Sequence, residues 1–229
     1  EVRQGFQGEL IRERAREYRR RNFATWRGVE PAAILAMNLK IDLEPSVRSL
    51  LMEGTYRVLN HTELAMPRIP FTLGPSFDDV RWTLNGAPAV AETRSHLQVL
   101  TPDRPLPPGG EIVVGFTYRS TLPRGLTRNG GEVSQFVLPS GIVLDSLTSG
   151  FLPQPGFDEG LGVDREDRFD PPEPAPDLGR ARLDPVIGSP VPFDARLEIS
   201  APRDFTVLAV GRKLSEQHDK ERTTVVWET

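Results

Sequence analysis

The sequence predicts an all-β protein, a large antiparallel β-sandwich of roughly a dozen strands with one N-terminal helix and a long proline-rich loop. Apolar and polar residues alternate with a period of two in many short runs, as they do in half-buried strands. Turn-forming residues, among them 22 prolines and 20 glycines, separate these runs. A helical spacing of apolar residues stands out near the N-terminus, in residues 5–26.

Length and composition limit the number of domains and the kinds of functional site that the chain can have. The 229 residues suffice for one large all-β domain or two small ones, and 38% hydrophobic residues support a packed core. A net charge of −4 gives no overall basic surface for nucleic acid. The absence of cysteine excludes disulfides, cysteine zinc sites and thiol nucleophiles, and it fits either the cytoplasm or an oxidising compartment. Because the chain begins with Glu1, we expect a processed product or a piece of a longer protein.

Residues 5–26 are predicted to form the helix. Leu10, Ala15, Tyr18 and Asn22 recur at helical spacing. Three glutamates each precede an arginine by three residues, which predicts a salt-bridged outer face (Glu9, Glu13 and Glu17 before Arg12, Arg16 and Arg20). These interleaved glutamates favour a solvated helix face over a nucleic-acid or membrane surface. We therefore divide the chain into a helix with its lead-in, residues 1–35, and a β domain, residues 36–229.

The β domain opens with the clearest pattern in the chain. Residues 37–43 and 52–58 alternate strictly, and Pro45-Ser46 separates them as a turn. Residues 68–73 start a third run, so this part is predicted to be an antiparallel meander with one solvated face.

Further strands follow in order. Residues 79–84 and the two-residue turn signal Asn85-Gly86 predict a hairpin, with residues 96–100 as the return strand. Residues 111–118, rich in β-branched and aromatic side chains, predict another strand. The remaining predicted strands are residues 132–138, 142–147, 195–200, 205–210 and 223–228. Residues 211–222, rich in charge, are predicted to be a long hairpin loop.

Residues 151–193 form the proline-rich excursion. Proline cannot donate to a sheet ladder, so an extended surface segment is predicted instead of further sheet. Its acids, from Asp158 to Asp170, do not have the spacing of a calcium-binding EF-hand loop. A carboxylate pair for glycoside hydrolysis is defined by its separation across a cleft, which spacing in sequence does not give. A solvated, proline-stiffened loop is the favoured interpretation.

Catalytic patterns are missing from the sequence. The three histidines, His61, His96 and His218, are far apart, whereas zinc hydrolases typically carry two histidines four apart on a helix. Ser140 and Ser149 each precede a glycine, but no G-x-S-x-G nucleophile elbow surrounds them. Residues 125–131 lack the lysine and helix of a phosphate-binding loop, and Asn60-His61-Thr62 matches the glycosylation pattern, a frequent chance match. We expect no catalytic residue, metal site or cofactor in this chain itself.

The order of the strand motifs resembles a known family. A strand of the form x-x-L-x-L-D-L-x-P, then x-G-x-x-x-x-x-x-N-x-T and a proline-containing strand, is matched at Asp42, Pro45, Gly54, Asn60 and Thr62. Residues 106–118 and 201–214 resemble the later L-x-x-G-x-x-x-x-L-x-x-x-Y and P-x-x-x-x-x-L-S-N-G strands of the same family. Together they resemble the N-terminal β domain of zinc metallopeptidases of the aminopeptidase N type, the gluzincins. This resemblance implies a saddle-like, mostly antiparallel β domain that precedes the catalytic domain.

Two further motifs resemble a bacterial branch of this family, in which the domain is carried on membrane proteins with ABC-transporter-permease-like helices. An E-x-x-Y helix precedes the first strand, as residues 13–21 do here. A P-x-x-G-[YF] motif followed by D-R resembles residues 153–158 and 167–168. The resemblance implies an extracytoplasmic domain, on the periplasmic side of the inner membrane, that meets the membrane only through transmembrane helices of its parent.

The resemblance also implies a function. The domain would be non-catalytic, would shape the substrate cleft and would pack on a catalytic domain of the same parent chain through an apolar surface, which would promote self-association of the isolated domain. The catalytic motifs H-E-x-x-H and G-x-M-E-N do not occur in this sequence, so zinc is expected only in the catalytic domain of the parent, unless that parent is a degenerate peptidase. Gln135 corresponds to a family residue that lines the pocket for the peptide substrate. The alternative is a self-contained extracytoplasmic β-sandwich module that binds a protein or a glycan.

Overall fold

The computed structural model describes residues 8–74, 77–121, 135–138, 141–144, 150–163 and 191–229. Within these residues the chain forms one α-helix, one short 3₁₀ helix and fourteen strands. In chain order they are α1 (Gly8–Trp26), β1 (Ala33–Glu44), η2 (Pro45–Val47), β2 (Ser49–Leu59), β3 (Ile69–Thr72), β4 (Phe77–Leu84), β5 (Ala87–Ala89), β6 (Glu92–Arg94), β7 (Leu97–Leu100), β8 (Glu111–Thr121), β9 (Gln135–Leu138), β10 (Gly141–Leu144), β11 (Gln154–Pro155), β12 (Asp194–Pro202), β13 (Arg212–His218) and β14 (Arg222–Glu228).

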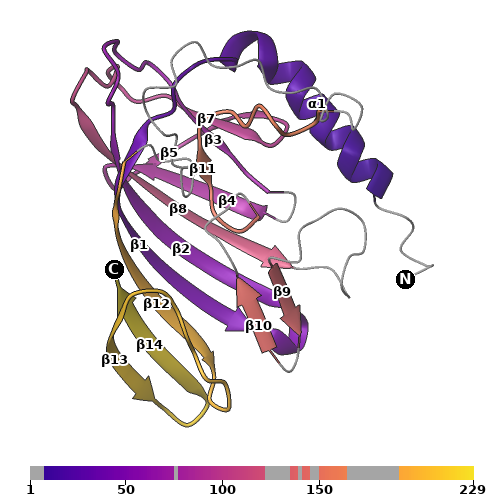
Figure 1. Ribbon diagram of the computed structural model, residues 1–229, viewed down its shortest axis with the longest axis vertical. Helices are drawn as coiled ribbons and strands as arrows, with labels where there is room; N and C mark the ends of the chain where they lie inside the picture. Colours follow the sequence, from indigo (N-terminus) through magenta and orange to yellow (C-terminus); the bar gives the residue numbers. More distant parts are fainter. Residues whose placement is uncertain (1–7, 75–76, 122–134, 139–140, 145–149, 164–190) are drawn as a thin grey trace, which may run out of the picture.

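The first layer is an eight-stranded sheet in the order β13-β14-β12-β1-β2-β8-β4-β5 (Figure 1). All neighbours are antiparallel except β1 and β12, which run parallel with Met37 opposite Ala195. The predicted all-β sandwich is confirmed, and the large sheet is mixed where a purely antiparallel one was expected. The parallel pair arises because β12 returns to the sheet after the long excursion and enters beside β1 from the same end.

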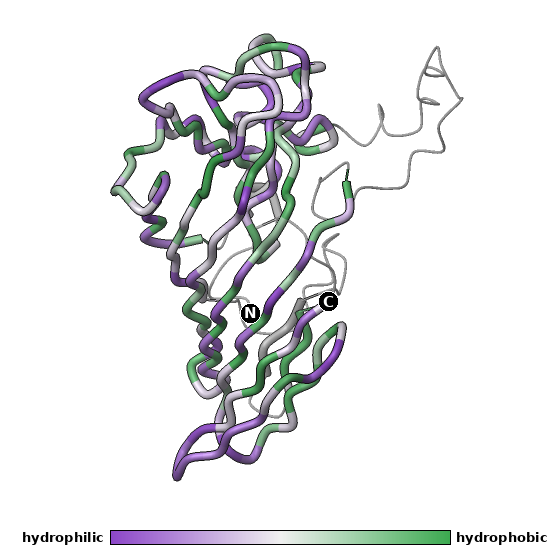
Figure 2. Tube along the Cα trace, turned by 90° about the vertical axis from the view of Figure 1, so that its left-hand side faces the viewer, coloured by the Kyte–Doolittle hydropathy of each residue, from purple (hydrophilic) through white to green (hydrophobic). Residues whose placement is uncertain are grey.

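The alternation predicted for the first two strands is present in the structure. Along β1 and β2 the inward residues are buried and the outward ones are mostly exposed, and Figure 2 shows hydrophobic and hydrophilic residues alternating along the long strands. Gly54 of β2 lies beneath the ring of Phe116 in β8, its register partner, so no larger residue fits there. The Asn85-Gly86 turn between β4 and β5 has positive φ at both residues, 51° and 83°, as the predicted two-residue hairpin requires.

The second layer is a four-stranded sheet in the order β11-β3-β7-β6. The meander predicted for residues 37–73 is therefore wrong in its third strand, because β3 leaves β2 and pairs with β7 and β11. Fully buried Asn60 directs this departure, since its side-chain amide donates to the carbonyls of Leu64 (2.8 Å) and Leu106 (2.8 Å). The predicted return strand, β7, also pairs in the small sheet, between β3 and β6, and not with β4.

The core lies between the two sheets. Ile69 and Phe71 of β3 face the large sheet, while Thr72 and the β7 residues Leu97 and Val99 face the helix α1. The predicted helix is confirmed, with Tyr18 fully buried against the small sheet. Helix α1 is thus a third layer that covers the outer face of the small sheet (Figure 1).

The first part of the predicted excursion belongs to the folded body. Phe151 and Leu152 are buried in the main core, and Gln154–Pro155 (β11) pairs with β3, so the prediction of no sheet is wrong here. Proline still limits strand formation here as predicted, because β11 has only two residues and lies at the edge of its sheet. Residues 164–190 lie outside the described part of the chain.

The C-terminal segment reverses two predictions. Residues 205–210 form no strand, and the predicted loop, residues 211–222, contains the edge strand β13 instead. Phe205, Val207 and Ala209 pack on the main core, but β12 already has β1 and β14 as neighbours, so no edge is free for this segment. Strand β13 takes the outer edge of β14, where its charged side chains remain in solvent.

None of the described helices is long and apolar enough to span a lipid bilayer.

Candidate functional site

The sequence-predicted site residue, Gln135, begins strand β9 and lies in register with Leu144 of β10. Strand β9 contacts η2, the turn between β1 and β2, and the β10 residues Ile142 and Leu144 pack on the main core. Figure 1 shows this β9–β10 hairpin beside the ends of β1, β2 and β8, well away from α1. The expectation that Gln135 lines a pocket stays a prediction.

The turn next to this hairpin is tightly built. Pro45 starts η2, and Arg48 closes it in the left-handed region with φ 54° and a backbone bond to the Pro45 carbonyl of 3.1 Å. Val47 is exposed at its tip. The short tip therefore presents an apolar residue beside β9.

A charged cluster lies close to the same turn. Arg222 of β14 donates from Nη1 to Glu44 (2.6 Å) and from Nη2 to Asp42, and its Nε donates to Ser200 Oγ at 2.9 Å. The guanidinium thus joins β1, β12 and β14 at one end of the sheet. These charge-assisted hydrogen bonds hold the three strands together, so we interpret Arg222 as a structural clamp.

The three histidines lie on separate elements. His61 contacts the Pro31 carbonyl (Nε2 to O, 3.0 Å), and His218 contacts Thr223 Oγ1 (2.9 Å) and Glu216. His96 lies beside α1, where burial lowers its pKa and the Arg14 charge lowers it further. In the described part of the chain no three side chains of His, Asp or Glu gather as a metal site would require.

The acids that begin the excursion serve the backbone. Asp158 accepts a hydrogen bond from the Gly160 amide (2.8 Å), and Glu159 accepts one from Gly28 beyond the helix end (2.8 Å). The remaining acids of that run, with Ser140 and Ser149, lie outside the described residues. Buried Asn60, with its amide donating to two carbonyls, is unsuited to glycosylation as it stands.

A shallow groove of 660 Å³ lies at the β5 edge of the large sheet, which is the edge opposite β13. It runs between β5 and the loop that precedes β8. Its wall is made of residues 87–90, residues 101–107 and the start of β8, with Asp103, Arg104 and Glu111 as its charged members. The side-chain oxygen of Asn85, one of the groove residues, already accepts a hydrogen bond from the Val113 amide at 3.0 Å. Among the described residues, no buried polar side chain is seen to point into the groove. The groove therefore lacks the convergent polar groups that mark a catalytic cleft.

Sequence patterns missed one polar cluster, the hydrogen-bond chain at Tyr18. The amide of Asp158 donates to Tyr18 Oη (2.7 Å), and the Thr72 hydroxyl donates to the Gly156 carbonyl (2.7 Å). The Tyr18 hydroxyl lies 2.7 Å from Thr72 Oγ1 and therefore supplies the hydrogen between them. A buried tyrosine at helical spacing was the only signal available, and it did not identify the partners.

Comparison with known proteins gives one kind of match. No family model matches the chain. No curated protein matches it either. Among solved structures, an M1 zinc metallopeptidase from Deinococcus radiodurans is similar over 88% of this chain and 39% of its own, with 18% identity and a TM-score of 0.58. A mutant of that metallopeptidase bound to a Tyr-Ser-Ala substrate covers 86% of this chain and 39% of its own at 17% identity, again with a TM-score of 0.58.

A two-domain M1 zinc metallopeptidase mutant bound to L-tryptophan gives the same picture, with 88% of this chain and 40% of that chain covered at 18% identity and a TM-score of 0.58. At such identities the similarity establishes a shared fold. The chain spans about two fifths of the length of these neighbours.

Proposed function

We propose that this chain is a non-catalytic β domain of an aminopeptidase-like protein of the zinc metallopeptidase family, which packs on a catalytic domain and shapes the substrate cleft. One observation carries the proposal. The described fold, from α1 to β14, is similar over 86–88% of its length to a part that makes up about 40% of M1 zinc metallopeptidases. The order of the strand motifs around Asp42, Gly54 and Asn60 supports the same assignment.

The side chains present support a non-catalytic role. Zinc-dependent peptide hydrolysis needs three protein ligands, a metal-bound water and a base that activates it. The described residues do not bring three candidate ligands together, so they do not fit a zinc ion. In this proposal zinc belongs to the catalytic domain of the parent chain, and no step of the reaction uses a residue of this domain as acid, base or nucleophile.

Gln135 has the one direct role in substrate binding that we propose. Its place at the start of β9, at the end of the sheet near η2, sets it on a short hairpin supported by the core through Ile142 and Leu144. A short supported hairpin suits a residue that lines a pocket, because it holds the main chain in place at little entropic cost on binding. The neutral amide would offer a donor and an acceptor to a peptide main chain.

Membrane anchoring, an ABC-transporter-permease-like fusion and a periplasmic location are further parts of the proposal. They rest on the motifs of residues 13–21 and 153–158 and on the family resemblance. The parent gene is the test: an H-E-x-x-H motif downstream of residue 229 and membrane spans in the same reading frame would support the assignment. A stop codon close to residue 229 would instead favour the self-contained binding module.

The first experiment measures the zinc content of the purified chain by plasma emission and its activity on a panel of aminoacyl-coumarin substrates. We expect neither stoichiometric zinc nor turnover, because the described residues hold no ligand set. Stoichiometric zinc, or turnover that purification does not remove, would overturn the non-catalytic assignment. The variant with His61, His96 and His218 all changed to glutamine would then identify whether histidines bind the metal.

A further inference from the structure

The feature that carries a further inference is the segment of residues 205–210, which connects β12 to β13. It is extended and alternates, with Phe205, Val207 and Ala209 packed on the main core. Leu208 and Val210 point the other way and are 80% and 63% exposed. No backbone hydrogen bond to residues 206–210 is present from any residue that the structure describes.

The edge strands of the eight-stranded and four-stranded sheets are protected against pairing. Strand β5, at one edge of the large sheet, has three residues with Pro88 at the centre. Strand β13, at the other edge, carries Arg212, Lys213 and Glu216 and a bulge beside Lys213. In the small sheet β6 lies against α1, and β11 has only two residues. These are the devices by which proteins prevent edge-to-edge association.

Residues 205–210 have none of these devices. The sequence Phe-Thr-Val-Leu-Ala-Val has no charge, no proline and no glycine, and its β-branched and aromatic residues favour a strand. Its backbone groups lack strand partners among the described residues, and its outward side chains are large and apolar. Such a segment is stabilised when another extended chain pairs with it.

We propose that residues 206–210 pair, antiparallel, with the same residues of a second copy of this chain, and that this pairing forms a two-fold symmetric dimer. An antiparallel pair centred on Leu208 sets that residue opposite its own copy and Thr206 opposite Val210. The same register brings Asp204 of each copy towards Arg212 of the other. Both are exposed, Asp204 in the turn before the segment and Arg212 after the bend at its end.

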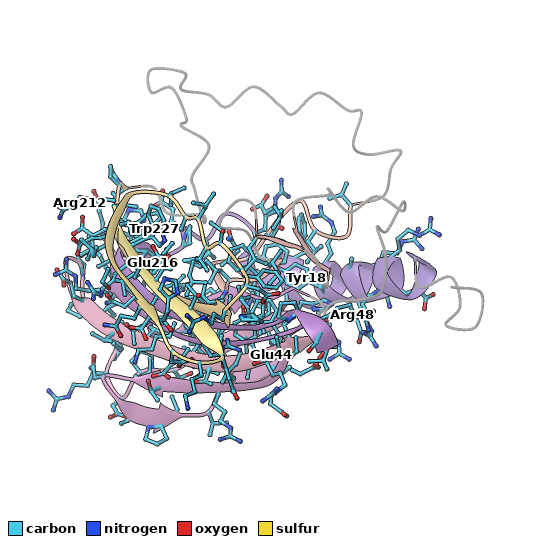
Figure 3. The ribbon with its side chains drawn as sticks, turned by 90° about the horizontal axis from the view of Figure 1, so that it is seen from below. Tyr18, Glu44, Arg48, Arg212, Glu216 and Trp227 are labelled. Atoms are coloured by element: carbon cyan, nitrogen blue, oxygen red, sulfur yellow. The ribbon has the colours of Figure 1, made fainter. Side chains whose placement is uncertain are left out.

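Charge complementarity is the argument for a second copy as the occupant. The segment itself is neutral, so specificity must come from its flanks, where Asp204 and Arg212 carry opposite charges at symmetric positions. Arg203 and Lys213 also fall opposite each other in this register, but each is held within its own chain, Arg203 by the Asp219 carbonyl and Lys213 by Glu216. The Arg212 side chain is free to contribute, because it is 80% exposed and its contact with Glu228 is long, at 3.9 Å. Figure 3 shows Arg212 at the outer margin of the molecule, pointing away from the body. Because each copy uses this one segment, the association closes at two chains.

The first test is the mass of the 229-residue chain in solution, by sedimentation velocity and light scattering over a wide range of concentration. We expect the average mass to rise from 25.5 kDa towards twice that value. Leu208→Lys should weaken the dimer at least about tenfold, because it places two ammonium groups face to face at the centre. Val90→Lys is the matched control, since Val90 is 95% exposed and lies next to β5.

The absence of cysteine allows a direct test of the register. Leu208→Cys should form a covalent dimer under mild oxidation, because opposite residues of an antiparallel pair bring their Cβ atoms within disulfide reach. Val90→Cys, at a position even more exposed than Leu208, reports the rate of random collision. Thr206→Cys mixed with Val210→Cys should cross-link faster than either variant alone. Asp204→Arg and Arg212→Asp should each weaken the dimer, and the double variant should restore it.

Three results would overturn this proposal. These are a monomer at every concentration, a dimer that Leu208→Lys leaves unchanged, and cross-linking of Leu208→Cys no faster than that of Val90→Cys. A monomer would leave the segment available to a different occupant, such as a catalytic domain of the parent chain. None of these outcomes depends on zinc or peptidase activity, so the dimer and the proposed function fail independently.

Discussion

The Tyr18 hydroxyl of helix α1 lies 2.7 Å from Thr72 Oγ1 of strand β3, and this bond joins the helix to the small sheet from inside the structure. Burial raises the pKa of the Tyr18 phenol, so the group stays protonated and keeps its hydrogen for Thr72. The Phe157 ring stacks on Tyr18 with 5.0 Å between centroids. The helix, the small sheet and the start of the excursion therefore share one buried contact region. The division between residues 1–35 and 36–229 stays a prediction.

Tyr18→Phe should lower the free energy of unfolding by about 1–3 kcal/mol, because it leaves the Asp158 amide and Thr72 Oγ1 without their partner. Urea denaturation followed by tryptophan fluorescence measures the change. Tyr56→Phe is the matched control. The Tyr56 hydroxyl is buried without a hydrogen-bond partner in the described part of the chain, so its removal should leave stability unchanged or raise it. Equal losses in both variants would contradict the assigned bonds.

Arg222→Lys should lower the free energy of unfolding by about 1–2 kcal/mol. Lysine keeps the charge but does not reproduce the fork that contacts Glu44, Asp42 and Ser200 together. The estimate is modest because both carboxylates are about half exposed, at 50% and 47%.

The control for this variant is Arg57→Lys, since the one ion pair of Arg57 within the described residues is an exposed 3.8 Å contact with Glu111. Its effect should be within about 0.5 kcal/mol. If the two variants lose the same stability in thermal and urea unfolding, Arg222 is not a clamp.

Gly54→Ala should destabilise the protein by roughly 1–3 kcal/mol or more. An added methyl group overlaps the Phe116 ring and lies 2.9 Å from Leu39 Cδ2, and both neighbours are buried. Gly141→Ala provides the comparison, because no atom of the described residues lies within 4 Å of a methyl group added there. That variant should be neutral or slightly stabilising. A Gly54→Ala protein with the wild-type denaturation midpoint would show that the Phe116 ring moves aside without cost.

The fold followed from the sequence wherever local pattern decides it. Strands β1 and β2, the Asn85-Gly86 turn and helix α1 have signals that lie within a few residues of each other. No such local signal tells which sheet β3 and β7 join, because that depends on how Asn60 redirects the chain and on partners far away in sequence. An alternating run specifies a pleat, but it does not specify a neighbour.

Residues 205–210 and β13 are two further cases in which local sequence pattern did not predict strand pairing. The apolar run has every local property of a strand, but the neighbouring strand β12 is already paired on both edges. The charged run at residues 212–218 has weak strand propensity, but it pairs with β14 as the edge strand β13, where the side chains on both of its faces are exposed. For the candidate site, sequence singled out Gln135 through a family resemblance, while the buried Tyr18 chain depends on contacts 54 and 140 residues apart.

His96 should make the protein less stable as pH falls below about 6.5, the ordinary histidine value. Burial is the main cause of its lowered pKa, Arg14 adds to it, and Glu17 and the Gly74 carbonyl act in the opposite direction. Because the folded-state pKa is below the unfolded one, the unfolded chain takes up its proton first. Stability is therefore complete above the unfolded pKa and is lost as pH falls towards the folded pKa.

The measurement is the urea midpoint of wild type and His96→Gln at pH 7.5 and at pH 5.5, a range above that in which ordinary carboxylates titrate. The wild type should lose more stability across this range than the variant, since glutamine does not take up a proton. His61→Gln, at an exposed position, controls for the loss of a histidine and should follow the wild type. If His96→Gln loses as much stability between these pH values as the wild type does, His96 is not the group that causes the loss.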